Sequence, residues 1–365
     1  MTRARPISLP TPYPLRPPSP PRGAARGLYT PPKTKEHRAV RRTIRPHRRE
    51  RIDMPVFDPL PDAPGVGDLP LHFWDGADFT VVPWPADTWE IGYNSHTWLL
   101  ERDGDRAVLK AVPKAYGVKF ASGLRAAEMA ERAGIPSGAP RRTRDGAVVA
   151  EHGDWCWGLL EHLDGRPTDT DNPTELALAG RSLGSIHASL RTVPPLPETM
   201  VWSQMDWLLE PQPFLAGLDW IQQAIREGFA ALPANLSDGI IHCDPRLTEF
   251  RFDGDKVGLL DWGEVMHGPH MLDVASTLSF AEEEIDTTPF LTGYLETSPA
   301  SPEEYAYLPT MLKMRAAIEG WIYARRRHFD VDLGQTGEHT NDTLIERARE
   351  NIAAADALPK DHYLL

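Results

Sequence analysis

The residues best suited to chemistry lie in one acidic stretch, HCDPRLTEFRFDGDKVGLLDWGE, which spans residues 242–264. It contains four aspartates and two glutamates. Carboxylates that lie a few ångströms apart repel one another unless a cation neutralises them or one of them is protonated. The stretch therefore indicates either a site for Mg²⁺, which takes oxygen ligands and usually keeps phosphate as a partner, or an acidic hairpin exposed to water.

The local pattern indicates how these carboxylates are positioned. The sequence FRFDGDKVGLL predicts short strands around residues 250–252 and 256–260, joined by a turn at Asp-Gly-Asp. The two aspartates of this turn flank its glycine, and we assign them to turn formation. Because a hairpin returns the chain close to its start, we expect Asp244, Glu249 and Asp261 to converge on one site.

The first part of the chain, about residues 70–163, is strand-rich. Its predicted elements are strands at 96–101 and 106–112 around an Asp103-Gly104 turn, a helix at 118–134, and a hairpin that turns at 152–154. Lys110 lies mid-strand between Val108 and Val112. A lysine among apolar neighbours indicates that its ammonium group reaches a phosphate, and a surface lysine is the alternative.

The second part of the chain is helical. Asn172 as the cap, Pro173 at the first helical position and Glu175 in a capping box predict a helix over 172–190. Ser301, Pro302 and Glu304 repeat this signal. A further helix is predicted at 314–329; we interpret it as a packed C-terminal helix with a basic face, and a contribution to an acceptor site is the alternative. A strand-rich lobe and a helical lobe predict a ligand site between them.

Composition bounds the class of protein. Two cysteines, Cys156 and Cys243, predict neither a disulfide scaffold nor a zinc cluster. His267 and His270 are interpreted as loop residues, because no cysteine or third histidine lies at metal-ligand spacing. No run of about 18 apolar residues occurs, so we expect no membrane span. No apolar segment follows the basic N-terminus, so we expect a cytoplasmic protein.

The charge is distributed unevenly. Residues 1–53 hold fourteen Lys and Arg against three Asp and Glu, a local net charge of +11, so −24 remains for the rest of a chain that totals −13. The basic, proline-rich segment cannot bury enough apolar surface to order itself, so we expect residues 1–65 to be a disordered arm. A nucleic-acid-binding arm and a translation start at Met54 are alternatives. The acidic remainder argues against nucleic acid as the substrate and favours a cationic or metal-bridged small molecule, and a negative surface that serves only solubility is the alternative.

Three segments, HCDPRLTEF, LLDWGE and GPHMLDVAS, resemble in order and spacing the aminoglycoside phosphotransferase and choline-kinase-like superfamily. The similarity is greatest to an actinobacterial-type branch of the phosphotransferase enzyme family. It implies an α+β, bilobal protein-kinase-like fold, with a nucleotide-binding N-lobe at 66–163 and a catalytic and acceptor-binding C-lobe at 164–365. It also implies transfer of the γ-phosphoryl group of ATP or GTP, with Mg²⁺, to a hydroxyl of an antibiotic, amino alcohol or sugar.

The resemblance assigns roles to individual residues of the acidic region. Asp244 matches the catalytic aspartate, which accepts the proton of the substrate hydroxyl or orients it. Asp261 matches the magnesium-binding aspartate after the hairpin. His242 and Asp273 match residues that support the catalytic loop. Glu249 stands where asparagine is usual; we expect it to be the second metal ligand, because glutamate still offers oxygen.

In the N-lobe the resemblance assigns the nucleotide contacts. Lys110 matches the phosphate-binding lysine of the third strand, and its expected glutamate partner is Glu128. The loop GYNSHT is expected to cover the phosphates through Gly92, Asn94 and Ser95, although it lacks a complete glycine-rich motif.

The interlobe hinge and the activity itself complete the expectations. The backbone of Glu161 and Leu163 is expected to bind the nucleobase. Glu264 is interpreted as a rim charge, with a metal or substrate contact as the alternative. Because Glu249 departs from the usual pattern, the alternative function is a kinase-fold binding or regulatory protein that has lost catalysis.

Overall fold

The computed structural model describes residues 60–75, 78–85, 91–92, 95–281, 285–331 and 339–364. Most of the predicted basic arm therefore lies outside the described residues, as does the alternative start at Met54. Residues 60–65 precede a short 3₁₀ helix at Val66–Asp68. Among the described residues, no helix combines the length and the apolar character needed to cross a bilayer.

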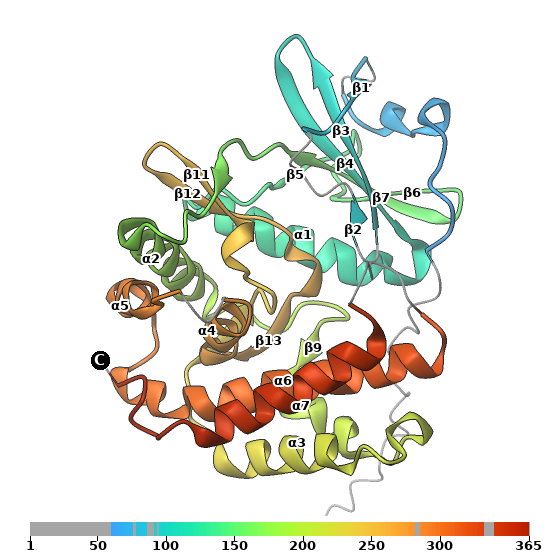
Figure 1. Cartoon of the computed structure of the whole chain (residues 1–365). Helices are drawn as coiled ribbons and strands as arrows, with labels where there is room; N and C mark the ends of the chain where they lie inside the picture. The colour runs from blue at the N-terminus through green and yellow to red at the C-terminus, as the bar shows by residue number, and fades with distance from the viewer. Residues whose placement is uncertain are drawn as a thin grey trace, which may run out of the picture. The chain divides into compact units, whose positions relative to one another are not determined.

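The first half of the fold is an antiparallel sheet with strand order β1-β3-β4-β7-β5, in which β2 also pairs with β3 and β6 with β7 (Figure 1). Its strands are β1 (Thr80–Val82), β2 (Ile91–Gly92), β3 (Ser95–Arg102), β4 (Asp105–Pro113), β5 (Pro140–Arg141), β6 (Ala150–His152) and β7 (Trp155–Glu161). Trp74, Leu100, Leu109 and Trp157 are fully buried in a core on this sheet. The strand-rich character predicted for this part is confirmed.

The turns of this sheet lie where the sequence predicts them. Asp103 and Gly104 both adopt positive φ angles, of 52° and 83°, as a two-residue hairpin turn requires. Gly153, with φ of 60°, turns β6 into β7. In the resulting register Lys110 lies between Thr97 on β3 and Gly158 on β7, in the middle of the sheet.

Helix α1 (Gly117–Arg132) packs against β4 and β7. Phe120 and Leu124 contact Val112 and Cys156 in a small separate core. The glycine at position 158 permits this approach, because a Cβ there would lie 2.9 Å from Leu124 Cδ1. Sheet and helix therefore form one support for Lys110.

The second half of the fold is mainly helical. Its helices are α2 (Pro173–Leu190), α3 (Asp219–Ala231), α4 (His270–Ser279), α5 (Thr288–Thr297), α6 (Leu308–His328) and α7 (Asn341–Ala357). Helices α6 and α7 run side by side (Figure 1). Helices α2 and α5 approach very closely through two glycines: a Cβ on Gly180 would lie 2.1 Å from Phe290 O, and one on Gly293 would lie 2.0 Å from Ala177 O.

Two small sheets hold the loops between these helices. One has the order β10-β13-β9, made of β10 (Asp238–Ile241), β13 (Met266–Pro269) and β9 (Met200–Val201). The other has the order β12-β11-β8, made of β12 (Lys256–Leu259), β11 (Phe250–Asp253) and β8 (Arg166–Pro167). The predicted acidic hairpin is β11–β12, with Phe250 opposite Leu259 and Gly254 in the turn at a φ of 58°.

The helix signals are confirmed with two corrections. Asn172 caps α2 by accepting from Thr174 N, but Glu175 accepts from Asp169 N and Arg166 and forms no capping box with the backbone of Asn172. Ser301 and Glu304 do form a capping box, on a 3₁₀ helix at Pro302–Tyr307 that leads into α6. Helix α6 consequently begins before the predicted residue 314. The α+β fold with a strand-rich first part and a helical second part is as predicted.

Candidate active site

Asp273 organises the loop between β10 and β11. Its buried carboxylate accepts hydrogen bonds from the backbone N–H of His242 at 2.7 Å and of Cys243 at 2.6 Å. His187 Nε2 lies 3.0 Å from the same carboxylate, and His187 Nδ1 lies 2.8 Å from Tyr294 Oη. A charged acceptor with several donors is a strong anchor. The start of helix α4 thus fixes the backbone immediately before Asp244.

His242 ties this loop to the end of the hairpin. The ring is buried, and its Nε2 atom lies 2.7 Å from Leu260 O. Because a carbonyl oxygen can only accept, Nε2 donates this hydrogen bond. The ring also meets Trp262 edge to face, with centroids 5.0 Å apart. The structure therefore places His242 between the residues that precede Asp244 and those that precede Asp261.

Lys110 and Asp261 meet although 151 positions separate them in the sequence: Lys110 Nζ lies 2.8 Å from Asp261 Oδ1. Asp261 adopts a left-handed backbone conformation, with φ of 58° and ψ of 66°, which is uncommon outside glycine. The positive charge of Lys110 lowers the pKa of Asp261 to about 2. The sheet and the hairpin thus bring the predicted phosphate-binding lysine onto the predicted metal-binding aspartate.

Glu249 lies next to Asp261 in this arrangement, because Leu260 N donates to Glu249 O at 3.1 Å. Burial raises the pKa of Glu249, and the negative charge of Asp261 raises it further. Two carboxylates that disfavour each other's charge, with hard oxygen donors, suit a divalent cation such as Mg²⁺. The chemistry of these donors therefore fits the expected metal, which Glu249 and Asp261 would hold.

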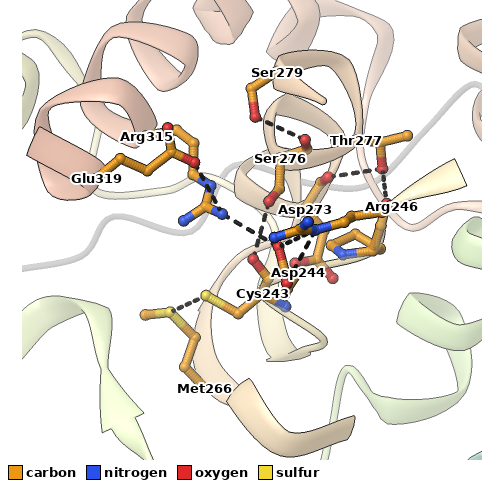
Figure 2. Close-up of polar contacts among 11 residues, drawn as sticks. Cys243, Asp244, Arg246, Met266, Asp273, Ser276, Thr277, Ser279, Arg315 and Glu319 are labelled. Atoms are coloured by element: carbon orange, nitrogen blue, oxygen red, sulfur yellow. Dashed lines mark hydrogen bonds and ion pairs between the residues drawn. The ribbon is translucent and has the colours of Figure 1, made fainter. Parts of the chain in front are cut away.

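The expected convergence of three carboxylates is corrected by the structure. Among the described residues, no three His, Cys, Asp or Glu side chains lie close enough together to hold a metal ion. Asp244 instead faces two cations: Arg246 Nε at 3.4 Å and Arg315 Nη2 at 3.3 Å (Figure 2). Its charge is balanced by these arginines, whereas that of Asp261 is balanced by Lys110.

The two arginines are themselves positioned by Phe280, which follows α4. The guanidinium carbon of Arg246 lies 4.1 Å, and that of Arg315 5.2 Å, from the centre of its ring. Arg315, on α6, also pairs with Glu319 at 3.3 Å. Arg246 was assigned no role from the sequence, although a cation two residues beyond Asp244 was the available signal.

Helix α1 contacts the site differently from the expectation. Glu128 does not reach Lys110, because it pairs with Arg142 at 2.6 Å and with Arg132 at 3.0 Å. The contact from α1 is Lys119 Nζ, which lies 2.6 Å from Glu264 Oε2. Glu264 is therefore an ion-pair partner of α1.

The remaining nucleotide contacts are only partly described. Gly92 pairs with Ser95 across β2 and β3, Ser95 is buried, and Asn94 lies outside the described residues. The Glu161 N–H donates to Ala139 O at 2.9 Å, so this group is already engaged within the fold and is not available to a nucleobase. Leu163, half-buried just beyond β7, keeps its predicted role as a prediction.

The two histidines near Asp273 are not loop residues. His267 lies in β13, and His270 begins α4 with a fully buried ring stacked on His187 at 4.6 Å.

The comparisons with known proteins agree with this geometry. A sequence profile described as "phosphotransferase enzyme family" matches residues 89–308. The structure of the amicoumacin kinase hAmiN in complex with AMP-PNP, Ca²⁺ and Ami has a TM-score of 0.60 and 16% identity, over 79% of this chain and 90% of that chain. Comparison with curated proteins finds no match.

Two further solved structures share the fold. The microcompartment-associated aminopropanol kinase has a TM-score of 0.59 and 16% identity, over 81% of this chain and 97% of that chain. Spectinomycin phosphotransferase in complex with ADP and spectinomycin has a TM-score of 0.52 and 12% identity, over 77% of this chain and 93% of that chain. At these identities the likeness establishes the fold alone, and it is the kinase-like fold predicted from the sequence.

Proposed function

This chain belongs to the phosphotransferase enzyme family, and from that premise we propose that it transfers the γ-phosphoryl group of ATP or GTP to a hydroxyl group of a small molecule. The observation that carries the proposal is the 2.8 Å contact of Lys110 with Asp261. A phosphate-binding cation and a metal-binding carboxylate must meet where the β- and γ-phosphates lie, and these two come from opposite halves of the fold.

The proposed mechanism uses each side chain for one task. Lys110 binds the phosphates as a point charge. Asp261 and Glu249 would hold Mg²⁺, which supplies charge neutralisation of the phosphates when bound. Asp244 orients the acceptor hydroxyl and accepts its proton, aided by a loop that Asp273 holds in place.

With ATP as the donor, the γ-phosphoryl group passes from the β–γ bridging oxygen to the acceptor oxygen. A bond forms between the acceptor oxygen and the γ-phosphorus, and the bond from that phosphorus to the bridging β–γ oxygen breaks. ADP leaves with the electron pair of the broken bond. The hydroxyl proton passes to an Asp244 oxygen and then to solvent.

A second candidate function is a nucleotide-binding protein without turnover. The observation that favours it is Glu249, whose pKa is raised by burial and by Asp261, in a position where the family usually has asparagine. A protonated Glu249 would hold a metal poorly. Both functions predict nucleotide binding, but the second predicts weaker binding of Mg²⁺ and no phosphorylated product.

The deciding experiment is a thermal shift with Mg²⁺ and ATP, then GTP, followed by a screen of acceptors with γ-labelled nucleotide. We expect labelled product from the wild type, and none from Asp244→Asn or Asp261→Asn. Asp253→Asn is the matched control, because Asp253 is an exposed aspartate of the hairpin turn. Nucleotide binding without labelled product from any acceptor would favour the second function.

The expected location and partners remain predictions. The cytoplasmic location, the small-molecule acceptor, and the absence of nucleic-acid and membrane partners rest on the sequence alone. The domain limits at 1–65, 66–163 and 164–365 are proposed in the same sense; the limit at 163 falls between β7 and β8.

A further inference from the structure

An apolar cavity of about 50 Å³ lies beside the loop that carries Asp244. Cys243, which precedes Asp244, and Met266 of β13 line one part of it. Met200, Met205, Trp207 and Trp321 also line it. Apolar atoms make up almost all of its surface. Methionines and tryptophans offer large, adaptable contact surface to an apolar ligand.

The charge of this cavity is unusual for so acidic a chain. Although the whole chain carries a net charge of −13, no described residue that lines the cavity has a carboxylate. The charged residue that lines it is Arg315. A polycationic acceptor would bring ammonium groups into apolar surroundings with no carboxylate among the lining residues, at a high desolvation cost.

Two residues that line this cavity carry hydrogen-bond donors that lack partners. The Nε atom of Arg315 and the Nε1 atom of Trp321 are buried and have no hydrogen-bond partner among the described residues. Trp321 is only 4% exposed. Buried donors are normally satisfied, and an unsatisfied one is costly, so these two atoms are suited to bind an oxygen of a ligand.

Arg315 connects the cavity to the chemistry. The same side chain that lines the cavity places Nη2 3.3 Å from Asp244 Oδ1, with Arg246 on the other side of the aspartate (Figure 2). An acceptor whose apolar body fills the cavity therefore reaches Asp244 past Arg315. Its oxygen substituents would meet the guanidinium on the way.

We propose that the acceptor is an alcohol with an apolar body that carries a carboxylate or carbonyl oxygen and no ammonium group, bound between this cavity and Arg315. The inference rests on the proposed function for the transfer step, but binding of the acceptor can be measured without it. It separates this chain from an acceptor site built for cationic amino sugars or amino alcohols.

The test uses three acceptors with the same hexane chain and a terminal hydroxyl: hydroxyhexanoate, hydroxyhexanamide and aminohexanol. Binding to the full chain is followed by the fluorescence of its tryptophans, two of which line the cavity, with and without Mg²⁺ and ATP. We expect the hydroxyhexanoate to bind roughly tenfold or more tightly than the aminohexanol, as one charge-assisted hydrogen bond provides. Equal or tighter binding of the aminohexanol, or no binding of any of the three, overturns the inference.

Variants identify the site. Arg315→Met should reduce the preference for carboxylate over ammonium to within roughly twofold, because the charge that discriminates is removed. Ile318→Phe, which fills the cavity, should weaken hydroxyhexanoate by roughly tenfold while the thermal shift by Mg²⁺ and ATP persists. Leu312→Phe is the control, since Leu312 is half-buried on the same helix but does not line the cavity. Unchanged hydroxyhexanoate binding in both cavity variants would place the ligand elsewhere and refute the proposal.

Failure of this inference is distinguishable from failure of the proposed function. If the chain phosphorylates spectinomycin or aminohexanol but does not bind hydroxyhexanoate, phosphoryl transfer stands and the acceptor class is wrong. If hydroxyhexanoate binds with the expected preference but no acceptor yields ADP, the acceptor class stands and the transfer is wrong.

Discussion

Replacement of Asp273 by asparagine tests whether its carboxylate anchors the loop before Asp244. The buried carboxylate accepts from three donors: His242 N at 2.7 Å and His187 Nε2 at 3.0 Å on Oδ2, and Cys243 N at 2.6 Å on Oδ1. An asparagine side chain has the same shape but accepts on one side only. In either amide orientation, its NH₂ group must face at least one of these donors.

The loss in free energy of unfolding depends on how many of these hydrogen bonds Asp273→Asn breaks. Losing one charge-assisted bond costs about 1.5–3 kcal/mol, and leaving a buried N–H unpaired costs about 1–3 kcal/mol more. We therefore expect Asp273→Asn to lower the free energy of unfolding by about 3–5 kcal/mol, in line with the removal of one partner from a buried charged group. A protein in the middle of the typical range of about 5–15 kcal/mol would remain folded after this loss.

The assay is urea unfolding followed by tryptophan fluorescence, with Ser276→Ala as the matched control. Ser276 Oγ also contacts this loop, donating to Cys243 O at 3.0 Å, but it is one neutral hydrogen bond, worth about 1 kcal/mol. The rate of ADP formation should fall in Asp273→Asn and change little in Ser276→Ala. If the two variants lose the same stability, the carboxylate is not the anchor of the loop and the reasoning is refuted.

Three further perturbations test the site and its support. Lys110→Met should abolish the thermal shift by Mg²⁺ and ATP and lower turnover by roughly 100-fold or more, because the phosphates lose their cation; an unchanged shift would show that Lys110 contacts only Asp261. Gly123→Ala should weaken nucleotide binding in the same assay, since a Cβ there would lie 2.1 Å from Trp262 O and push the segment after Asp261 away from α1; retained affinity would contradict this. Burial lowers the pKa of His270 to about 2. Below a pH of about 6.5 the unfolded chain therefore binds more protons than the folded chain, and the free energy of unfolding should fall as the pH falls. This one group contributes at most about 1.4 kcal/mol per pH unit. His270→Phe should remove that part of the slope in urea titrations between about pH 7.5 and 5; an identical slope in wild type and variant would exclude His270 as its origin.

Much of the local structure was predictable because short-range chemistry decides it. The Asp-Gly-Asp turn, the positive φ that glycine accepts there, and the alternating residues on both sides predict the β11–β12 hairpin from eleven residues alone. The hairpin in turn predicts that Glu249 lies beside Asp261, as the structure has it. Cap residues likewise predicted where α2 begins.

Some assignments failed because several partners were available to one charge. Glu128 was the expected partner of Lys110, but Arg142 and Arg132 both lie within reach of it on its own side of α1. Glu175 had the spacing of a capping box, but the guanidinium of Arg166 is a stronger partner than a backbone N–H and lowers the pKa of Glu175 to about 2.

The sequence by itself determined the family, the order of the chemical groups, and the hairpin that pairs Glu249 with Asp261, because these depend on residues a few positions apart. Only the tertiary structure decided the 2.8 Å pairing of Lys110 with Asp261, the contact of Arg315 with Asp244, and the apolar cavity beside them. Such contacts join segments tens to hundreds of residues apart. They depend on how α1, α4 and α6 pack against the sheets, and packing responds to the shape of many side chains at once.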